Sequence, residues 1–251
     1  MNLLESAILK AEWAHTHLHL LDLDIERTFG PKLQRIAGQF DAQNSRHIFR
    51  RHIGNPQWQE WSLTVGDIAN NLRASLDHIA YQFRLEAVKD LRELERITFP
   101  ILQQPNSGTF SFLAKVLEPN AFKQIEKSQP YNTLGRWPEI VLSPLWVINE
   151  LARIDKHRSL NIIPLMTAIE PLKIPGHGIL RVSLDNTYLV ATVSGDVNPQ
   201  DKLEPEFSIE PGIELTIENT IYHYNFGYLH DAYNIIRNEI IPTFESILPS
   251  R

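Results

Sequence analysis

The chain has 251 residues, of which 43% are hydrophobic and 22% are charged. This composition is typical of a globular protein and argues against intrinsic disorder. No apolar run approaches the roughly 20 residues that a membrane-spanning helix needs, so no membrane partner is expected. The absence of cysteine excludes disulfides and thiolate metal sites. It fits a reducing compartment, and we expect a cytoplasmic protein.

Charge is distributed unevenly along the sequence. Residues 1–159 contain 19 Lys and Arg against 18 Asp and Glu, whereas residues 160–251 contain 5 against 12. Because phosphate contacts require basic side chains, RNA, if it is a partner, would bind to the first part. The alternative is that the acidic part only keeps the protein soluble and that no nucleic acid binds, and both interpretations stay open.

The first element in chain order is a long amphipathic helix. Apolar residues recur at three- and four-residue spacing over residues 2–28, and Gly30-Pro31 would end the helix. Residues 46–53 and 57–63 then alternate in a way that predicts a short hairpin.

Three further helical segments follow. The apolar spacing predicts a helix over residues 64–94, with Thr64 as its N-cap. Two short helices are expected within residues 107–127. Ser143-Pro144 then begins a helix over residues 144–158, with serine at the N-cap and proline at the first helical position.

The pattern changes near residue 162. Between residues 162 and 222 apolar and polar residues alternate between turn-forming residues, which predicts an antiparallel sheet of about four or five strands. Residues 226–248 return to helical spacing, and Pro242 is expected to kink or end that helix. The expected fold is α+β: a helical bundle region over 1–160, then an antiparallel sheet and a C-terminal helix over 161–251, packed as one unit.

The helix predicted over residues 64–94 combines an apolar stripe with a polar face. Asn and Asp are weak helix formers, so their number here suggests a contact or a function. A solvated face with an Arg73–Asp77 pair is the alternative. The polar residues that cluster opposite the stripe are Asp67, Asn71 and His78, flanked by Asn70, Asp77 and Tyr81.

Two charged residues fall on the apolar side of the helix over 144–158, namely Asp155 and Arg158. A buried charge is costly unless it is paired, so we expect this helix to cross the polar face of the 64–94 helix. A last turn that overhangs the core, with both side chains solvated, is the alternative. The expected contacts are Asp155 with Arg73 or His78, and Arg158 with Asp77 or Asp67.

Two segments resemble the signature blocks of a family of bacterial proteins without an established activity. They are Gly66-Asp67-x-x-x-Asn71-Leu72-Arg73-x-x-Leu76-Asp77-His78 and Asp155-Lys156-His157-Arg158. The resemblance extends to the long first helix and to the sheet and helix near the C-terminus. It implies the α+β architecture and carries no activity.

Arg73 and His78 are also similar to the Arg-x(4–6)-His motif of the HEPN ribonucleases. That resemblance implies metal-independent cleavage of RNA by a homodimer, with no cofactor. His78 would act on the 2′-hydroxyl as a general base or acid, and Arg73 would stabilise charge on the phosphate. The expected supporting residues are Asp67, Asn71, Asp77, Asp155, His157 and Arg158. The alternative is a non-catalytic ligand- or partner-binding scaffold whose polar cluster locks two helices together.

Two further groups of residues have weaker functional interpretations. His15, His19 and Asp22 lie on one side of the first helix and could contribute to a metal site, although solvated histidines are the simpler interpretation. Basic residues near Trp58 and Trp61 are typical of single-stranded nucleic acid binding, or of a surface hairpin over the core. These basic residues are Arg46, His47, Arg50, Arg51 and His52. The sequence contains no phosphate-binding glycine loop or nucleophile elbow, which argues against kinase, P-loop, Rossmann and serine-hydrolase functions.

Overall fold

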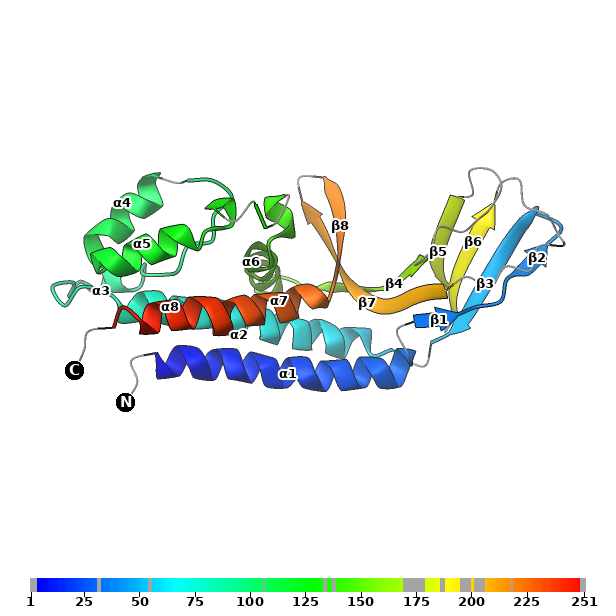
Figure 1. Ribbon diagram of the computed structural model, residues 1–251, viewed down its shortest axis with the longest axis horizontal. Coiled ribbons are helices and arrows are strands. Elements are labelled where there is room, and N and C mark those ends of the chain that lie inside the picture. Colours follow the sequence, from blue (N-terminus) through cyan, green and yellow to red (C-terminus); the bar gives the residue numbers. More distant parts are fainter. Residues whose placement is uncertain are drawn as a thin grey trace. The chain divides into compact units, whose positions relative to one another are not determined.

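The structure is a computed structural model in which α-helices and antiparallel sheets combine as an α+β fold (Figure 1). It describes residues 4–30, 33–53, 56–105, 107–132, 135–136, 139–168, 179–185, 188–194, 200, 206–217 and 219–248. The predicted fold class is confirmed.

The chain divides into two compact units, which are described separately below. The helical unit comprises Met1–His19, Ser62–Leu160 and Gly227–Arg251, and the sheet unit comprises Leu20–Trp61 and Asn161–Phe226. This division differs from the expected one. A break does fall at residue 160, but the C-terminal helix belongs with the first helices and residues 20–61 belong with the strands.

The helical unit is built around α1 (Glu5–Phe29) and α2 (Trp58–Gln82), each of which also contributes residues to the sheet unit. Figure 1 shows α1, α2 and the C-terminal helical segment lying side by side. The apolar stripes predicted for both long helices are buried, and α1 ends at Gly30, whose φ of 70° favours glycine. The shorter helices of this unit are α3 (Leu91–Leu94), α4 (Ser107–Val116), α5 (Pro119–Lys127) and α6 (Pro144–Asp155). Short 3-10 turns cover Pro130–Asn132 and Ile140–Leu142.

Helix α2 begins six residues earlier than predicted, so Thr64 is not its N-cap and residues 57–63 do not form a hairpin with 46–53. In the sheet unit Trp58 and Trp61 pack on the ring of Phe29, with ring centroids 6.1 and 5.9 Å away. The Trp61 indole N–H also donates to Asp24 Oδ2 at 2.6 Å. These contacts fix the first helical turn, which period-two alternation in the sequence did not reveal.

The predicted helix over 64–94 also ends early, at Gln82. The chain turns there because Leu85 N–H donates to the carbonyl of Val116, and Glu118 N–H donates to the carbonyl of Phe83. Only α3 remains of the second half, as one turn that Asp90 caps by accepting a hydrogen bond from Arg92 N–H. Tertiary hydrogen bonds therefore override the helical spacing of residues 83–94.

The C-terminal helical segment continues through Pro242 instead of ending there. It comprises α7 (Gly227–Ile235), a π-helical turn (Ile236–Ile240) and α8 (Ile241–Glu245). Ile241 N–H donates to the carbonyl of Ile236, one residue further back than in an α-helix. The π turn ends two residues before Pro242, and this wider turn lets the helix accommodate a residue whose backbone nitrogen cannot donate a hydrogen bond.

The sheet unit contains two four-stranded antiparallel sheets. In the first, β7 (Glu206–Ile217) pairs with β1 (Leu33–Arg35), β4 (Asn161–Ala168) and β8 (Thr220–Asn225). The second has the order β2 (Gln39–Asp41), β3 (Arg46–His52), β6 (Tyr188–Ser194) and β5 (Ile179–Asp185). Phe49 of β3 and Phe207 of β7 are both buried, and their rings lie 5.4 Å apart in the core of this unit.

The antiparallel strands expected between residues 162 and 222 are confirmed, but they are divided between two sheets instead of forming one. The short strands β1 and β2 were not predicted, because three residues are too few to show an alternating pattern. Among the described residues, no helix has the length and apolar character needed to cross a membrane.

Candidate functional site

Arg73, the first of the two residues expected to be catalytic, lies on α2 inside a hydrogen-bonded network. Its Nε donates to Asn149 Oδ1 of α6 at 3.1 Å, and its Nη1 donates to Asp77 Oδ1 at 2.5 Å. Its Nη2 donates to the carbonyl of Phe99 at 2.7 Å. All three guanidinium nitrogens therefore have acceptors within the helical unit, and only 16% of the side chain is exposed.

Asp77 completes this network from one turn further along α2. Its Oδ1 accepts from Arg73 and also from the backbone N–H of Phe99, at 2.8 Å. Arg73 and Asp77 thus bind the backbone carbonyl and the backbone N–H of Phe99, respectively. The ring of Phe99 packs on Phe244 of α8, with centroids 6.4 Å apart. Arg73 and Asp77 therefore hold Phe99 in the position in which its ring packs on the C-terminal helical segment.

Asp155 contacts α2 as expected, but at different residues. Its Oδ2 accepts a hydrogen bond from Asn70 Nδ2 at 2.8 Å. Its carboxylate also lies over Gly66, where a Cβ atom would overlap the carboxylate oxygens. The partners predicted for Asp155, Arg73 and His78, are not the ones it has. Gly66 allows α6 to approach α2 closely, and Asn70 then satisfies the half-buried charge.

A third set of polar contacts joins α2 to α1. Asn71 accepts a hydrogen bond from Lys10 Nζ at 3.1 Å and donates to the carbonyl of Asp67. The buried hydroxyl of Ser75 donates to the carbonyl of Ala7 at 2.8 Å. The polar face of α2 is therefore largely a set of contacts with α1, α6 and residue 99. We call the three sets together the α2 polar lock; its side chains are Lys10, Asn70, Asn71, Arg73, Ser75, Asp77, Asn149 and Asp155.

Three of the predicted supporting residues do not join the lock. Asp67, His157 and Arg158 are exposed. Arg158 was expected near Asp77 or Asp67, but α6 ends at Asp155 and the following turn carries His157 and Arg158 into solvent. The alternative of an overhanging last turn is therefore correct for Arg158 and wrong for Asp155.

His78, the second expected catalytic residue, is half-buried at the wall of a cavity of about 310 Å³. Asp77, Ser6 and Ile97 also line this cavity, whereas Arg73 does not. Nδ1 of His78 is buried and makes no hydrogen bond with any residue that the structure describes. His78 thus faces a space from which the Arg73 guanidinium is turned away.

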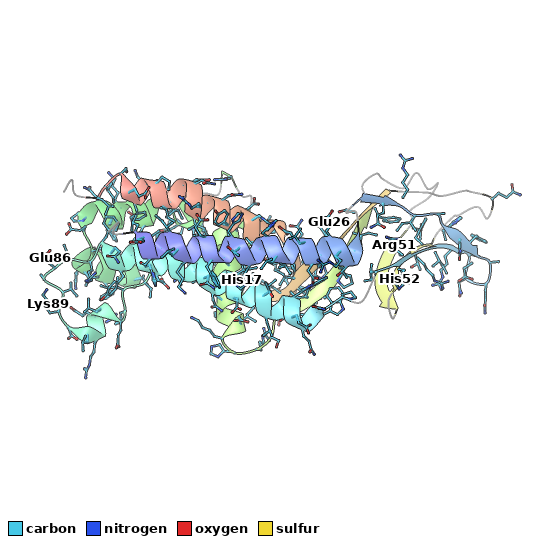
Figure 2. The ribbon with its side chains drawn as sticks, turned by 90° about the horizontal axis from the view of Figure 1, so that it is seen from below. His17, Glu26, Arg51, His52, Glu86 and Lys89 are labelled. Carbon is cyan, nitrogen blue, oxygen red and sulfur yellow. The ribbon has the colours of Figure 1, made fainter. Side chains whose placement is uncertain are left out.

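The histidines of α1 do not assemble a metal site in the described part of the chain, where no group of three or more His, Asp or Glu side chains could hold an ion. The ring of His15 stacks on Tyr233 of α7 at 4.4 Å. His17, labelled in Figure 2, contacts the ring of Trp13. His15 therefore serves packing between α1 and α7.

The basic residues near Trp58 and Trp61 lie on β3, where alternate side chains point to opposite faces. His47 is buried, and Arg46 pairs with Asp41 at 3.1 Å, while Arg50 and His52 are exposed. Figure 2 labels Arg51 and His52 at the end of this strand. The five residues therefore do not form one continuous basic surface.

A polar contact between α1 and the C-terminal segment was not predicted. Arg237, in the π-helical turn, donates to Glu12 Oε1 at 2.6 Å, and the hydroxyl of Tyr233 donates to Glu12 Oε2 at 3.4 Å. Burial, together with the charge and hydrogen bond of Glu12, raises the pKa of Tyr233 above its ordinary value. The hydrogen bond to Glu12 likewise raises the pKa of Arg237. Such long-range pairs leave no local pattern in the sequence.

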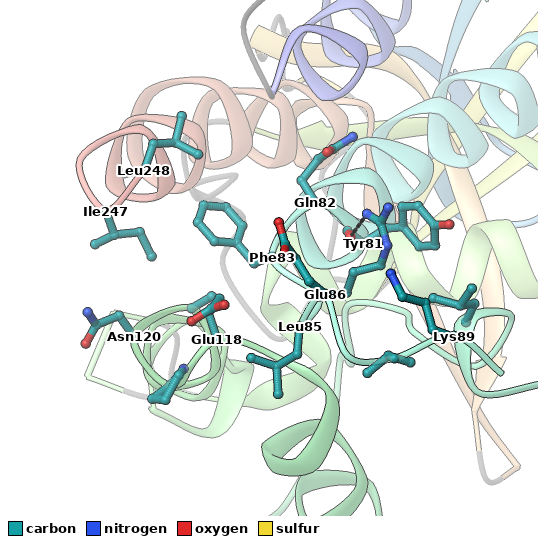
Figure 3. Close-up of a pocket in the computed structure, with 15 residues that line it drawn as sticks. Tyr81, Gln82, Phe83, Leu85, Glu86, Lys89, Glu118, Asn120, Ile247 and Leu248 are labelled. Carbon is teal, nitrogen blue, oxygen red and sulfur yellow. Dashed lines mark hydrogen bonds between the residues drawn. The ribbon is translucent and has the colours of Figure 1, made fainter. Parts of the chain in front are cut away.

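A second cavity, of about 980 Å³, lies beyond the end of α2 and was also not predicted (Figure 3). It is lined by residues 81–86, 88, 89 and 94, by residues 118–121 at the start of α5 and by residues 247–248. The apolar spacing predicts a helix through residues 83–94, so it gives no sign of the loop that forms one wall of this cavity. We call this cavity the α2-end cavity.

Comparison of the chain with family models, with curated proteins and with solved structures finds no match.

Proposed function

We propose that this protein is a non-catalytic binding scaffold whose α2 polar lock holds the helical unit together. One observation carries this proposal: every nitrogen of the Arg73 guanidinium donates to an acceptor of the unit itself. An arginine that stabilises charge on a substrate phosphate needs donors directed at the substrate. Those of Arg73 are directed at Asn149, Asp77 and the carbonyl of Phe99.

The resemblance to the two bacterial signature blocks agrees with this proposal. The blocks are far apart in sequence, and they meet where Gly66 and Asn70 contact Asp155. Arg73 and Asp77, from the first block, secure Phe99. A structural role accounts for these residues without any reaction. The absence of cysteine supports the cytoplasm as the location.

A double-mutant cycle tests whether Arg73 acts as part of a lock between helices. Arg73→Ala and Asn149→Ala should each lower the free energy of unfolding, and their coupling should reach about 1–2 kcal/mol, since a half-buried charged donor loses its acceptor. The control is Arg153 with Glu150, a pair within α6 in which 62% of the arginine side chain is exposed, and its coupling should stay at about 0.3–0.5 kcal/mol. Denaturant unfolding gives the four free energies of each cycle. Additivity of the Arg73 and Asn149 variants would contradict the lock.

A HEPN-like ribonuclease remains the second candidate, favoured by one observation. His78 and Asp77 line an open cavity, and Nδ1 of His78 lacks a hydrogen-bond partner in the described part of the chain. This candidate requires a homodimer in which a second subunit supplies the phosphate-stabilising charge that Arg73 does not offer. It predicts cleavage of RNA that persists in EDTA and depends on His78.

A further inference from the structure

We propose that the α2-end cavity binds an amphipathic carboxylate, with an apolar chain along one side and the carboxylate beside Arg84 and Lys89. The inference rests on the proposed binding function, of which it names the site and the class of ligand. The volume of about 980 Å³ lies in the range of small-molecule sites in proteins.

One side of the cavity is apolar and comes from separate parts of the chain. Phe83 is buried and its ring packs on Phe244, with centroids 5.3 Å apart. Leu85, Ile247 and Leu248 are half-buried around it. Figure 3 shows Ile247 and Leu248 on the opposite side of the cavity from Tyr81 and Lys89. An apolar chain that displaces water from these half-buried aliphatic side chains lowers the free energy of the complex.

The other side carries two cations. The guanidinium of Arg84 lies 4.2 Å from the centre of the Tyr81 ring, and its Nη1 donates to the carbonyl of Tyr81 at 2.9 Å. The aromatic face and the carbonyl together hold the guanidinium in place while its other donors remain available. Lys89 is exposed, and Figure 3 shows it on the same side of the cavity as Tyr81.

These two cations have no carboxylate partner among the described residues. Glu86 and Glu118 also line the cavity, yet neither forms an ion pair with Arg84 or Lys89 in the part of the chain that the structure describes. Figure 3 places Glu118 beside Asn120, away from Lys89. Arg84 and Lys89 therefore present unpaired positive charge to the cavity, and this charge favours an anion even though Glu86 and Glu118 also line it. A carboxylate fits because arginine can bind it through two parallel hydrogen bonds.

The ligand class follows from the two sides together. A fully polar anion would leave the surface around Phe83 and Leu248 wet, and a neutral hydrocarbon would leave Arg84 and Lys89 without a counter-charge. An amphipathic cation could pair with Glu86 or Glu118, but Arg84 and Lys89 would repel it and would still lack a counter-charge. An amphipathic carboxylate satisfies both sides in one orientation.

Fluorescence titration of the purified protein with dansyl-undecanoate tests the site. We expect saturable binding that dodecanoate displaces more effectively than dodecanol or dodecyltrimethylammonium. The double variant Arg84→Gln/Lys89→Glu should weaken binding by about tenfold or more, because charge-assisted hydrogen bonds are lost. Leu248→Asp should weaken it through the apolar side. The control is Lys115→Glu, which reverses the charge of an exposed lysine on α4 that does not line the cavity and should leave the affinity unchanged.

Three outcomes would overturn the proposal. They are absence of saturable binding, displacement by dodecyltrimethylammonium as effective as displacement by dodecanoate, and equal affinities for the double variant and Lys115→Glu. Circular dichroism of each variant identifies any that fails to fold, and Lys89→Glu alone, at an exposed position, then provides the comparison. Cleavage of RNA would refute the non-catalytic function and leave this site intact, whereas failure to bind dansyl-undecanoate would refute this site alone.

Discussion

Arg73 and Asp77 illustrate how a half-buried ion pair is tolerated. Isolated pairs four residues apart on a helix contribute only a few tenths of a kcal/mol. Here the same two side chains also bind Asn149 and both backbone polar groups of Phe99. Each partner therefore satisfies a group that would otherwise be left without a hydrogen bond inside the helical unit. The sequence predicted the pair but could not reveal the additional acceptors.

Gly66 gives the sharpest prediction at the residue scale. Gly66→Ala places a methyl group where the Asp155 carboxylate lies, so the carboxylate must move and lose its hydrogen bond from Asn70. The free energy of unfolding should fall by roughly 1–3 kcal/mol, although alanine is the better helix former. Thermal or denaturant unfolding measures the loss.

The second variant in this test removes the obstacle itself. In an Asp155→Ala background, Gly66→Ala should cost much less, because the methyl group then has room. If the Gly66→Ala protein is more stable than the wild type, as helix propensity alone predicts, then α6 does not approach α2 closely at this residue.

Helices and strands were predictable to different extents. The stripe of α1 and α2 and the proline-initiated start of α6 are local patterns, and the structure has them. The ends of α2 depend on Trp61 bonding Asp24 and on Leu85 bonding Val116, which are distant in sequence. The same distance hides the pairing of β3 with β6, so a hairpin with residues 57–63 was the wrong choice.

The contact between α1 and the C-terminal segment should depend on pH. Because the pKa of Tyr233 is raised on folding, its contribution to stability is fully present below the ordinary value of 10.0 and is lost as the pH rises through the folded-state pKa. Ionised Tyr233 would also repel Glu12, whose carboxylate its hydroxyl contacts. The wild-type free energy of unfolding should therefore fall more steeply above pH 10 than that of Tyr233→Phe.

The measurement is denaturant unfolding of both proteins at pH 8 and at several values above pH 10. The value at pH 8 serves as the reference for each protein, so the comparison is independent of the effect of the substitution itself. If the free energies of unfolding of the two proteins fall in parallel, burial and Glu12 do not raise the pKa of Tyr233 on folding.

On the scale of the whole molecule, the fold class followed from where the periodicity changes, but the grouping of elements did not. The helical unit joins segments from both ends of the chain, and the sheet unit joins residues 20–61 to 161–226. Local patterns carry no information on which distant segments share a core. The sequence pattern drew attention to the polar residues of α2 but left their role open, because their partners lie on α1, on α6 and at Phe99.

The most direct test of the non-catalytic assignment is incubation of purified protein with fluorescently labelled single-stranded and double-stranded RNA, with and without EDTA. Wild type and His78→Ala, prepared identically, should leave both substrates intact at every time point, because all three guanidinium nitrogens of Arg73 donate to acceptors within the helical unit. RNA cleavage by the wild type that persists in EDTA and disappears in His78→Ala would contradict the non-catalytic assignment. It would establish His78 as a catalytic residue of a ribonuclease.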